Sequence, residues 1–477
     1  MIDDKIEFFI DREELSFLST WLKSPDRKPM ILRGARQVGK SFLVRQLAKK
    51  HNLTLAEVNF ELQPKFASIF NNPDPAYIVP KLEEALDVRI SSGTLLFLDE
   101  VQICTEAITA LRYFYEKRKE IPIIAAGSLL EFALSDLKSP MPVGRVSFRW
   151  LTPLSFREYL NARKLEILQE AIQKFVSKKE VISEIVHERL LSELAVYACV
   201  GGMPEAMKRA LVGGKALVSE AALVHNDILL SYRSDFYKYR GRLPVESLNA
   251  ILDAMPQIVG QTKVKYTSIS RDIRSASLKS ALDALDKAGV MKRVCASAAQ
   301  AIPLSAGENR ENYKILPLDV GLFISQSFLG SHTQRPVANL FDKWTQGDVF
   351  EKKWLGQIAE TLVGQALHYH SQGQHLYYWM RDARGAEAEV DYLTQVGTQI
   401  VPIEVKAGSS GTLRSLHVLM AEKSLKKALR FDLNLPSIQD IDMNIPTTGE
   451  KMKRAKYKLF NLPLYLADWM FELLEKI

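Results

Sequence analysis

One segment constrains the fold more than any other. Gly34-Ala-Arg-Gln-Val-Gly-Lys-Ser41 matches the pattern G-x-x-x-x-G-K-[ST], follows the apolar run Met30–Leu32, and precedes a helical pattern that begins at Phe42. In this strand–loop–helix context the glycines let backbone N–H groups curl around phosphate oxygens at a helix N-terminus. We therefore expect Lys40 to contact the β- and γ-phosphates of a nucleotide and Ser41 to ligate Mg²⁺.

The segments around this loop have the pattern of a mostly parallel α/β sheet. Short apolar runs alternate with amphipathic stretches over residues 1–150, and they predict strands at Met30–Leu32, Leu53–Asn59, Thr94–Leu98 and Ile121–Ala125. The third strand leads into Asp99 and Glu100, and ligands of such sheets bind at the carboxyl ends of the strands. We expect Asp99 to hold Mg²⁺ and Glu100 to polarise the attacking water.

Two later residues complete the predicted nucleotide site. The fourth apolar run ends at Ser128, and a small polar residue there suits a sensor of the γ-phosphate. Arg145 is a candidate for an arginine that stabilises transition-state charge, often in a neighbouring subunit; a fold-stabilising surface arginine is the alternative. The candidate catalytic residues are thus Glu100, Ser128 and Arg145, and the candidate nucleotide and Mg²⁺ contacts are Gly34, Arg36, Gly39, Lys40, Ser41, Phe42 and Asp99.

These segments resemble a family of prokaryotic AAA+ ATPases whose C-terminal half is a domain of unknown function. The resemblance covers most of the chain and rests on the phosphate loop, Leu98–Glu100, Gly127-Ser128, Val143–Val146, Leu151–Glu158, Gly201–Glu205 and Leu318–Leu322. It implies an ATPase core with a helical lid, ATP and Mg²⁺ as cofactors, and a homo-oligomer that is usually a ring, with a hexamer as one expected size. No lid arginine for the γ-phosphate stands out; Lys208 and Arg209 are the candidates.

Cysteine content and hydropathy restrict the class of protein. The three cysteines, Cys104, Cys199 and Cys295, lie far apart in 477 residues. This spacing excludes a disulfide scaffold and a zinc finger, and it suits a reducing cytoplasm. The charged N-terminus predicts no signal peptide. No run approaches the roughly 20 apolar residues that span a bilayer, so we expect a cytoplasmic chain without a membrane partner.

The net charge of +7 is distributed unevenly along the chain. Residues 1–150 hold 21 basic and 20 acidic side chains, so the predicted nucleotide domain is close to neutral. Residues 261–293 hold 8 basic and 3 acidic side chains, and residues 451–458 hold 5 basic side chains and no acidic one. We therefore expect the later half of the chain to meet any anionic partner.

The first basic segment has the order of a winged helix-turn-helix. Lys265–Arg274 predicts a short helix, and Ser275–Ser277 supplies N-cap residues for a second one over Leu278–Ala288. Val290–Val294 could pair with Tyr313–Pro317 as a wing. The residues expected to face a DNA backbone are Lys279, Lys287, Lys292 and Arg293. Acidic residues on the second helix weaken this interpretation, and winged helices also mediate protein contacts, so both alternatives stay open.

A second carboxylate constellation lies in the C-terminal region. Asp391 and Glu404 are equally distant from a turn at Gly397-Thr398, so a hairpin would place them opposite each other with Cβ atoms about 5 Å apart. Lys406 lies two residues beyond Glu404 and projects from the same face. Two carboxylates and a lysine at one place suit a Mg²⁺ site in which Lys406 steadies a hydroxide or a phosphate oxygen.

This arrangement is similar to the PD-(D/E)xK nuclease superfamily. Glu360, on an amphipathic helix, matches the first-helix acid of the archaeal Holliday-junction resolvase branch, whereas Val390 stands where the superfamily motif has proline. The resemblance implies Glu360, Asp391, Glu404 and Lys406 as catalytic residues, with Asp391 and Glu404 as metal ligands. Two alternatives remain: an exposed charged hairpin, or a nuclease fold used for DNA binding or assembly without cleavage.

Together these features predict an α/β chain of several parts. The expected parts are a P-loop AAA+ core at 1–154, a helical lid at 155–242, a winged helix-turn-helix at 243–330, a linker at 331–348, and an α/β restriction-endonuclease-like domain at 349–477. The expected function is an ATP-driven motor on DNA, branched DNA in particular, coupled to a Mg²⁺-dependent nuclease-like domain that cuts or grips it. The alternatives are an ATP-dependent switch or remodeller of a protein partner, and an ATPase that only grips DNA.

Overall fold

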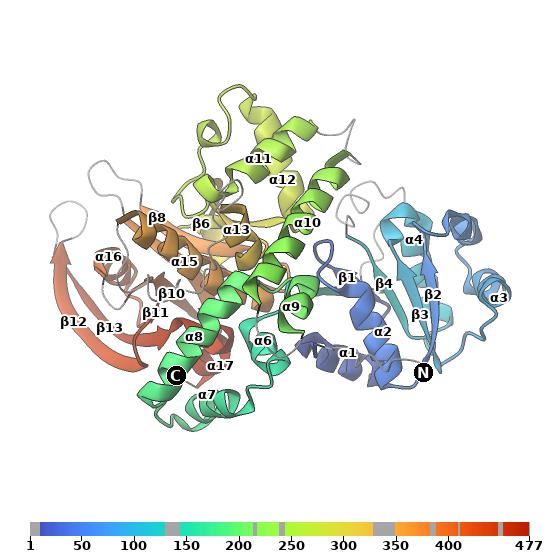
Figure 1. Ribbon diagram of the computed structural model, residues 1–477, viewed down its shortest axis with the longest axis horizontal. Coiled ribbons are helices and arrows are strands. Elements are labelled where there is room, and N and C mark those ends of the chain that lie inside the picture. The colour runs from blue at the N-terminus through green and yellow to red at the C-terminus, as the bar shows by residue number, and fades with distance from the viewer. Residues whose placement is uncertain are drawn as a thin grey trace. The chain divides into compact units, whose positions relative to one another are not determined.

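A computed structural model describes residues 10–128, 144–212, 217–237, 244–327, 349–381, 388–408, 411–446 and 452–476 (Figure 1). The predicted linker at 331–348 lies outside the described residues. Residues 1–9, for which no signal peptide was predicted, lie outside them as well. The chain divides into two compact units. The N-terminal unit holds Asp11–Thr152 with Ala284–Val290, and the C-terminal unit holds the remainder.

The N-terminal unit contains a parallel sheet with the strand order β2-β3-β4-β1-β5. Its strands are β1 (Met30–Arg33), β2 (Thr54–Asn59), β3 (Thr94–Asp99), β4 (Ile123–Ala126) and β5 (Ser147–Trp150). The four predicted strands are therefore confirmed, and β5 was not predicted. Every residue of β3 is buried, as expected for an apolar run covered on both faces.

Helices follow the strands in the same unit. They are α1 (Glu13–Lys23), α2 (Lys40–Lys50), α3 (Pro75–Leu86) and α4 (Thr105–Lys117), with 3-10 segments η1 (Pro64–Asn71) and η2 (Val101–Ile103). Side chains of β1, β2, β3 and α4 form one apolar core, which includes Ile31, Val58, Leu98 and Leu111. Because these strands are parallel, the polar residues after β1, β2, β3 and β4 lie at one edge of the sheet.

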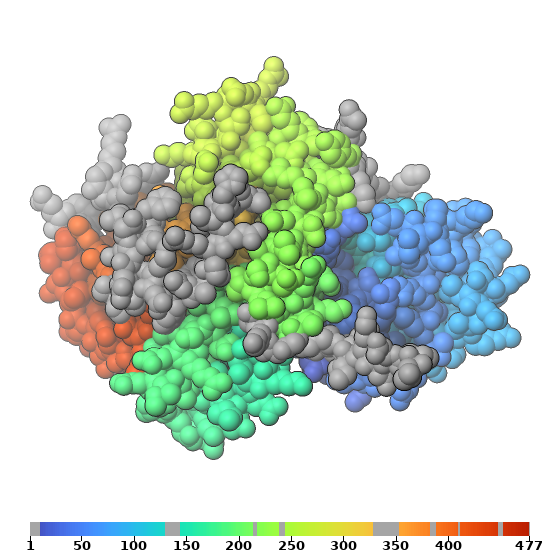
Figure 2. Space-filling model, viewed as in Figure 1, coloured from blue at the N-terminus to red at the C-terminus, as the bar shows by residue number. Residues whose placement is uncertain are grey.

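The C-terminal unit begins with helices. They are α6 (Phe156–Ala162), α7 (Glu166–Lys178), α8 (Glu184–Val200), α9 (Pro204–Leu211), α10 (Val218–Phe236) and α11 (Val245–Ile258), and α13 (Val320–Ser327) follows later. Figure 1 shows α8 beside α17 (Met470–Glu475) near the C-terminus, and Figure 2 shows the surface of the α7–α8 segment in green. His187 of α8 contacts the Tyr465 hydroxyl at 2.9 Å and the Leu433 carbonyl at 3.0 Å, which ties these distant segments together.

Two of the motifs on which the family resemblance rests meet inside this unit. Asp319 is fully buried, and its carboxylate accepts hydrogen bonds from the Gly202 N–H at 2.6 Å and the Leu322 N–H at 3.0 Å. A Cβ atom on Gly201 would lie 2.2 Å from Asp319 Oδ1, so only glycine fits there. The Gly201-Gly202 and Leu318–Leu322 motifs thus hold the α8–α9 turn against the start of α13.

An eight-stranded mixed sheet forms the rest of the C-terminal unit, with the order β12-β13-β11-β10-β9-β8-β6-β7. Its strands are β6 (Met291–Ser297), β7 (Glu308–Pro317), β8 (Leu376–Arg381), β9 (Ala388–Val396), β10 (Gln399–Val405), β11 (Lys427–Asp432), β12 (Ser437–Pro446) and β13 (Met452–Pro463). Helix α15 (Val349–Ser371) contacts β7, β8 and β10, and α16 (Arg414–Lys423) contacts β9, β12 and β13. The 3-10 segment η7 (Leu464–Trp469) and α17 (Met470–Glu475) end the described chain.

The predicted wing belongs to this sheet. Strands β6 and β7 pair as expected, with Met291 opposite Pro317 and Val294 opposite Lys314, and β6 also pairs in parallel with β8. Helix α12 (Ser275–Lys287) precedes them. The helix predicted at 265–274 was wrong, because only a 3-10 turn, η4 (Tyr266–Ser268), forms there. Since β6 is hydrogen bonded on both sides, the hairpin is not a free wing.

Candidate functional site

The phosphate loop links β1 to α2 through two glycines with positive φ angles. Gly39, at the N-cap of α2, has φ 92°, and Gly34 has φ 135°. A Cβ atom on Gly34 would lie 2.2 Å from the Leu151 carbonyl oxygen. Both positions therefore require glycine, and the loop lies tightly against the chain that follows β5.

Lys40 is buried at the start of α2. Its Nζ donates to the carbonyl oxygens of Gly34 at 3.0 Å and Ala35 at 2.7 Å. Burial lowers the pKa of Lys40 to about 8, while the nearby Glu100 and Asp99 act in the opposite direction. The ammonium is thus held inside the loop, where it can meet phosphate oxygens.

Ser41 and Asp99 converge at the carboxyl edge of the sheet. The Ser41 hydroxyl donates to Asp99 Oδ2 at 2.9 Å, and Asn59 Nδ2 donates to the same oxygen at 3.3 Å. Burial raises the pKa of Asp99, and the hydrogen bond from Ser41 opposes this shift. A hydroxyl and a carboxylate side by side fit Mg²⁺ bound to a nucleotide. Asn59 was not predicted as part of this site, although it ends β2 and pairs with Asp99 of β3.

Glu100 follows Asp99 in a left-handed backbone conformation, with φ 52°. Its carboxylate accepts a hydrogen bond from Gln102 Nε2. A Cβ atom on Gly127 would lie 2.1 Å from the Gln102 side-chain oxygen, so glycine before Ser128 leaves room for this contact. Ser128 lies two residues beyond the end of β4, which stands between β3 and β1, and therefore at the same edge as the phosphate loop.

The remaining candidates of this site are placed differently. Arg36 lies within the loop, half-buried, and Phe42 is exposed on the first turn of α2. Arg145 precedes β5 and therefore lies at the amino edge of the parallel sheet, away from the loop of its own chain. Its guanidinium forms an ion pair with Glu116 at 3.1 Å and lies 6.0 Å from the ring centroid of Tyr115.

Arg12, which precedes α1, was not predicted as part of this site. Its side chain is 6% exposed, and it donates to the carbonyl oxygens of Val38 at 3.2 Å and Thr152 at 2.7 Å. Val38 stands directly before Gly39, so the Arg12 side chain holds the phosphate loop against the chain after β5 by hydrogen bonds to both. No periodicity in the sequence marks this contact, because it joins residues 26 and 140 positions apart.

The second candidate site lies in the C-terminal unit. Strands β9 and β10 pair with Val396 opposite Gln399 and Tyr392 opposite Ile403, which is the predicted hairpin register. The next pair in this register is Asp391 and Glu404. Asp391 Oδ2 accepts a hydrogen bond from the Val405 N–H at 2.6 Å. Glu404 Oε1 accepts one from Lys406 Nζ at 2.5 Å.

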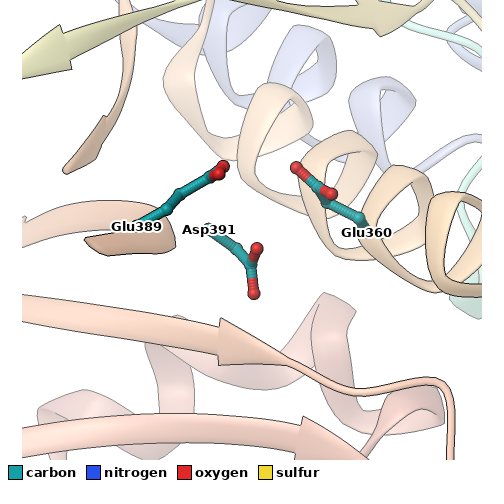
Figure 3. A group of neighbouring side chains, drawn as sticks. All are labelled: Glu360, Glu389 and Asp391. Atoms are coloured by element: carbon teal, nitrogen blue, oxygen red, sulfur yellow. The ribbon is translucent and has the colours of Figure 1, made fainter. Parts of the chain in front are cut away.

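Three carboxylates gather beside this hairpin. Figure 3 shows Glu360 of α15 and Glu389 of β9 pointing toward one another, with Asp391 beside them, and one oxygen atom from each of the three lies within 4.8 Å of the other two. Burial raises the pKa of Glu360 to about 7 and that of Glu404 to about 8. Among the residues that the structure describes, this group of potential metal ligands includes Glu389, which was not predicted, and does not include Glu404.

A buried lysine already lies among these carboxylates. Lys314 of β7 is buried, and its Nζ lies 2.6 Å from Glu360 Oε1 and 2.9 Å from Glu389 Oε1. Glu360 and Glu389 hold the pKa of Lys314 well above its usual value despite burial. Mg²⁺ would need these oxygens at about 2.0–2.1 Å, but the ammonium already lies against them. With Lys314 in this place, the cluster does not fit a metal ion.

The four residues predicted to meet DNA occupy different surroundings. On α12, Lys279 forms an ion pair with Glu311 at 3.1 Å, and Lys287 is exposed. On β6, the half-buried Lys292 donates to the Gly373 carbonyl oxygen at 3.4 Å. Arg293, also half-buried, forms an ion pair with Asp283.

A groove of about 630 Å³ in the C-terminal unit is lined by other basic side chains. We call it the basic groove; its charged and hydroxyl-bearing lining residues are Lys263, Lys265, Lys353, Arg381, Glu389, Thr262, Ser268 and Ser415. Arg381 forms an ion pair with Glu422 at 2.7 Å. Within the described parts of the chain, no such pair engages Lys263, Lys265 or Lys353, which are exposed. Glu389 links the groove to the carboxylate cluster.

Comparisons with known proteins agree with the N-terminal geometry. An AAA domain model matches residues 26–160, and models of two domains of unknown function, DUF8612 and DUF4143, match residues 191–333 and 355–447. No curated protein matches the chain. None of the helices in the described ranges combines the length and hydropathy needed to cross a membrane.

Several solved structures are similar at low identity. The Aeropyrum pernix ORC1 protein in complex with DNA is 13% identical, over 68% of this chain and 94% of that chain, with a TM-score of 0.29. The Aeropyrum pernix ORC2 protein is 16% identical, over 59% of this chain and 86% of that chain, with a TM-score of 0.33. The Thermotoga maritima RuvB Holliday junction branch migration motor is 15% identical, over 60% of this chain and 90% of that chain, with a TM-score of 0.29.

The family match covers the parallel sheet, the glycine loop, and the paired Ser41 and Asp99. These are the parts that a P-loop ATPase needs to hold a nucleotide and its metal ion. Residues 26–160 are therefore an AAA domain of the P-loop ATPase class, which uses ATP and Mg²⁺.

Proposed function

We propose that this chain uses ATP hydrolysis in its N-terminal unit to act on DNA, and that its C-terminal unit holds the DNA in the basic groove. The observation that carries the proposal is the set of three exposed lysines in that groove, Lys263, Lys265 and Lys353. Phosphate contacts from such lysines supply most of the affinity of proteins for DNA without regard to sequence. A groove built this way binds the backbone rather than the bases.

The basic groove suits this role better than the α12–β6 surface does. Lys279 and Arg293 already face Glu311 and Asp283, so a phosphate would have to compete with a carboxylate. Lys292 is half-buried in a strand with neighbours on both sides. We therefore assign the DNA contact of the C-terminal unit to the groove lysines.

Fluorescence anisotropy with labelled linear, forked and four-way DNA tests this assignment. The groove variant Lys263→Gln/Lys265→Gln/Lys353→Gln is expected to bind about tenfold more weakly, with the slope of log K against log salt reduced by about one per lysine. The matched control Lys174→Gln/Lys178→Gln/Lys179→Gln removes the same charge on or beside α7. An equal loss of DNA affinity in both variants would contradict a specific role of the groove. Tighter binding of four-way DNA than of linear DNA would support a branched substrate.

We also propose that the protein works as a homo-oligomeric ring in which Arg145 acts on the neighbour's nucleotide. Arg145 lies at the sheet edge opposite its own phosphate loop, which supports action across subunits. Arg145→Ala and Lys40→Ala proteins are each expected to lose ATP hydrolysis. A mixture of the two should recover part of it if the arginine acts in a neighbour, because some interfaces then pair an intact loop with an intact arginine. No recovery in mixed oligomers would exclude this role.

The paired cations of the α12–β6 surface favour one alternative, which is a switch that acts on a protein partner. ATP hydrolysis would then be independent of DNA, and binding to DNA would be absent even at low salt. DNA-stimulated hydrolysis that the groove variant loses would exclude this alternative.

A further inference from the structure

The carboxylate cluster of the C-terminal unit contains its own cation. Lys314 lies in the second half of β7 and extends to α15 and β9, where its Nζ contacts Glu360 at 2.6 Å and Glu389 at 2.9 Å. The side chain is only 3% exposed. The rings of Tyr378 and Tyr392 flank the ammonium, with centroids at 4.9 and 5.3 Å.

This position is strongly constrained. Two carboxylates and two aromatic faces all favour a positive charge, and burial removes the water that would compete for the ammonium. Moving Lys314 away would leave Glu360 and Glu389 facing each other without a counter-charge. Breaking a buried ion pair in this way is strongly unfavourable, so the lysine is not easily displaced.

The carboxylates that sequence analysis assigned to a metal ion are also engaged. Asp391 Oδ2 accepts the Val405 N–H at 2.6 Å, and Glu404 Oε1 accepts Lys406 Nζ at 2.5 Å. Glu404 does not belong to the three-carboxylate group with Glu360 and Glu389. The hairpin therefore carries the residues of the nuclease pattern, while Lys314 occupies the space between the clustered acids.

We propose that Lys314 is the resident cation of this cluster and replaces a divalent metal ion there. The C-terminal unit then grips the phosphodiester backbone in the adjoining basic groove without cutting it. The grip on DNA rests on the proposed function. The role of Lys314 in the carboxylate cluster does not depend on it. It predicts that the carboxylates bind a divalent metal ion only after the ammonium has been removed.

Binding of Mn²⁺ to the full chain without nucleotide, followed by electron paramagnetic resonance, tests the proposal. Wild type and Asp391→Asn should bind the same amount of Mn²⁺, because the cluster binds none in either protein. Any weak binding of Mn²⁺ at the phosphate loop is the same in both and cancels in the comparison. Lys314→Met should gain one Mn²⁺ with at least tenfold higher affinity, and Lys314→Met/Asp391→Asn should lose it. Lys406→Met, which removes a lysine outside the three-carboxylate group, is the matched control and should gain none.

Mn²⁺ bound by wild type and lost in Asp391→Asn would overturn the proposal. This comparison needs no Lys314 variant, so it remains decisive if Lys314→Met does not fold. Cleavage of labelled four-way DNA by wild type with Mg²⁺ or Mn²⁺, abolished in Asp391→Asn, would overturn it as well. DNA binding is measured separately in EDTA: its absence would refute the DNA grip while leaving the Mn²⁺ result for the cluster intact.

Discussion

Replacement of Arg12 by methionine is expected to loosen the nucleotide site from behind. Arg12 donates to the carbonyl oxygens of Val38 and Thr152, at 3.2 and 2.7 Å, and its side chain is buried. One carbonyl belongs to the phosphate loop and the other to the chain after β5, so the guanidinium fixes the loop to the end of the sheet. Methionine fills much of the same space but cannot donate.

The size of the effect follows from these two hydrogen bonds. A hydrogen bond from a charged donor contributes about 1.5–3 kcal/mol to stability, and its loss leaves a buried carbonyl without this donor. Together they give a loss of about 3–6 kcal/mol, which corresponds to a fall in Tm of about 10–20 °C for a unit of this size. ATP should bind about tenfold more weakly, because the loop amides are no longer held in the binding geometry.

Calorimetric unfolding of the full chain, with and without MgATP, measures both effects, since the nucleotide identifies the transition of the N-terminal unit. Arg45→Met is the matched control. Arg45 belongs to the same unit and forms an ion pair with Glu57 at 2.6 Å, but its side chain is 55% exposed. Its loss should cost less than about 1 kcal/mol. If Arg12→Met and Arg45→Met have the same Tm and the same ATP affinity, the bracing role of Arg12 is wrong.

Three further changes have definite expected outcomes. Glu100→Gln should keep ATP binding by calorimetry but slow phosphate release about 10²–10⁴-fold; an unchanged rate would exclude Glu100 as the residue that polarises water. Gly201→Ala places a Cβ 2.2 Å from Asp319 Oδ1 at φ 69°, so it should destabilise the C-terminal unit in urea by more than about 2 kcal/mol. Gly397→Ala, at φ 58° with open space around it, is the control and should cost less. Burial lowers the pKa of His225 from 6.5 to about 4, so below pH 6.5 the unfolded chain takes up a proton that the folded chain does not. Stability in urea should therefore fall by about 2 kcal/mol between pH 7 and pH 5, and His225→Gln should lack that part of the change.

The backbone and the neighbouring side chains of the candidate nucleotide site could largely be predicted from sequence because the signals are local. Gly34–Ser41 is one contiguous turn whose backbone conformation depends on its own glycines, and it lies between a recognisable strand and helix. The four strands of the first sheet follow from apolar runs of the right length. The β9–β10 register follows from the two-residue period of a strand and the position of its turn.

The structure alone identified the partners that come from distant segments. Asn59 meets Asp99 because β2 pairs with β3. Arg12 meets the phosphate loop from the segment before α1, and Lys314 meets Glu360 where β7 packs against α15. Periodicity tells which face of a strand a residue occupies, but not which strand will lie beside it. The nuclease-like pattern shows this limit most clearly. The sequence by itself determined where Asp391, Glu404 and Lys406 stand on their hairpin, whereas only the tertiary structure decided that a lysine from another hairpin lies among the acids, because that ion pair depends on packing between segments far apart in the chain.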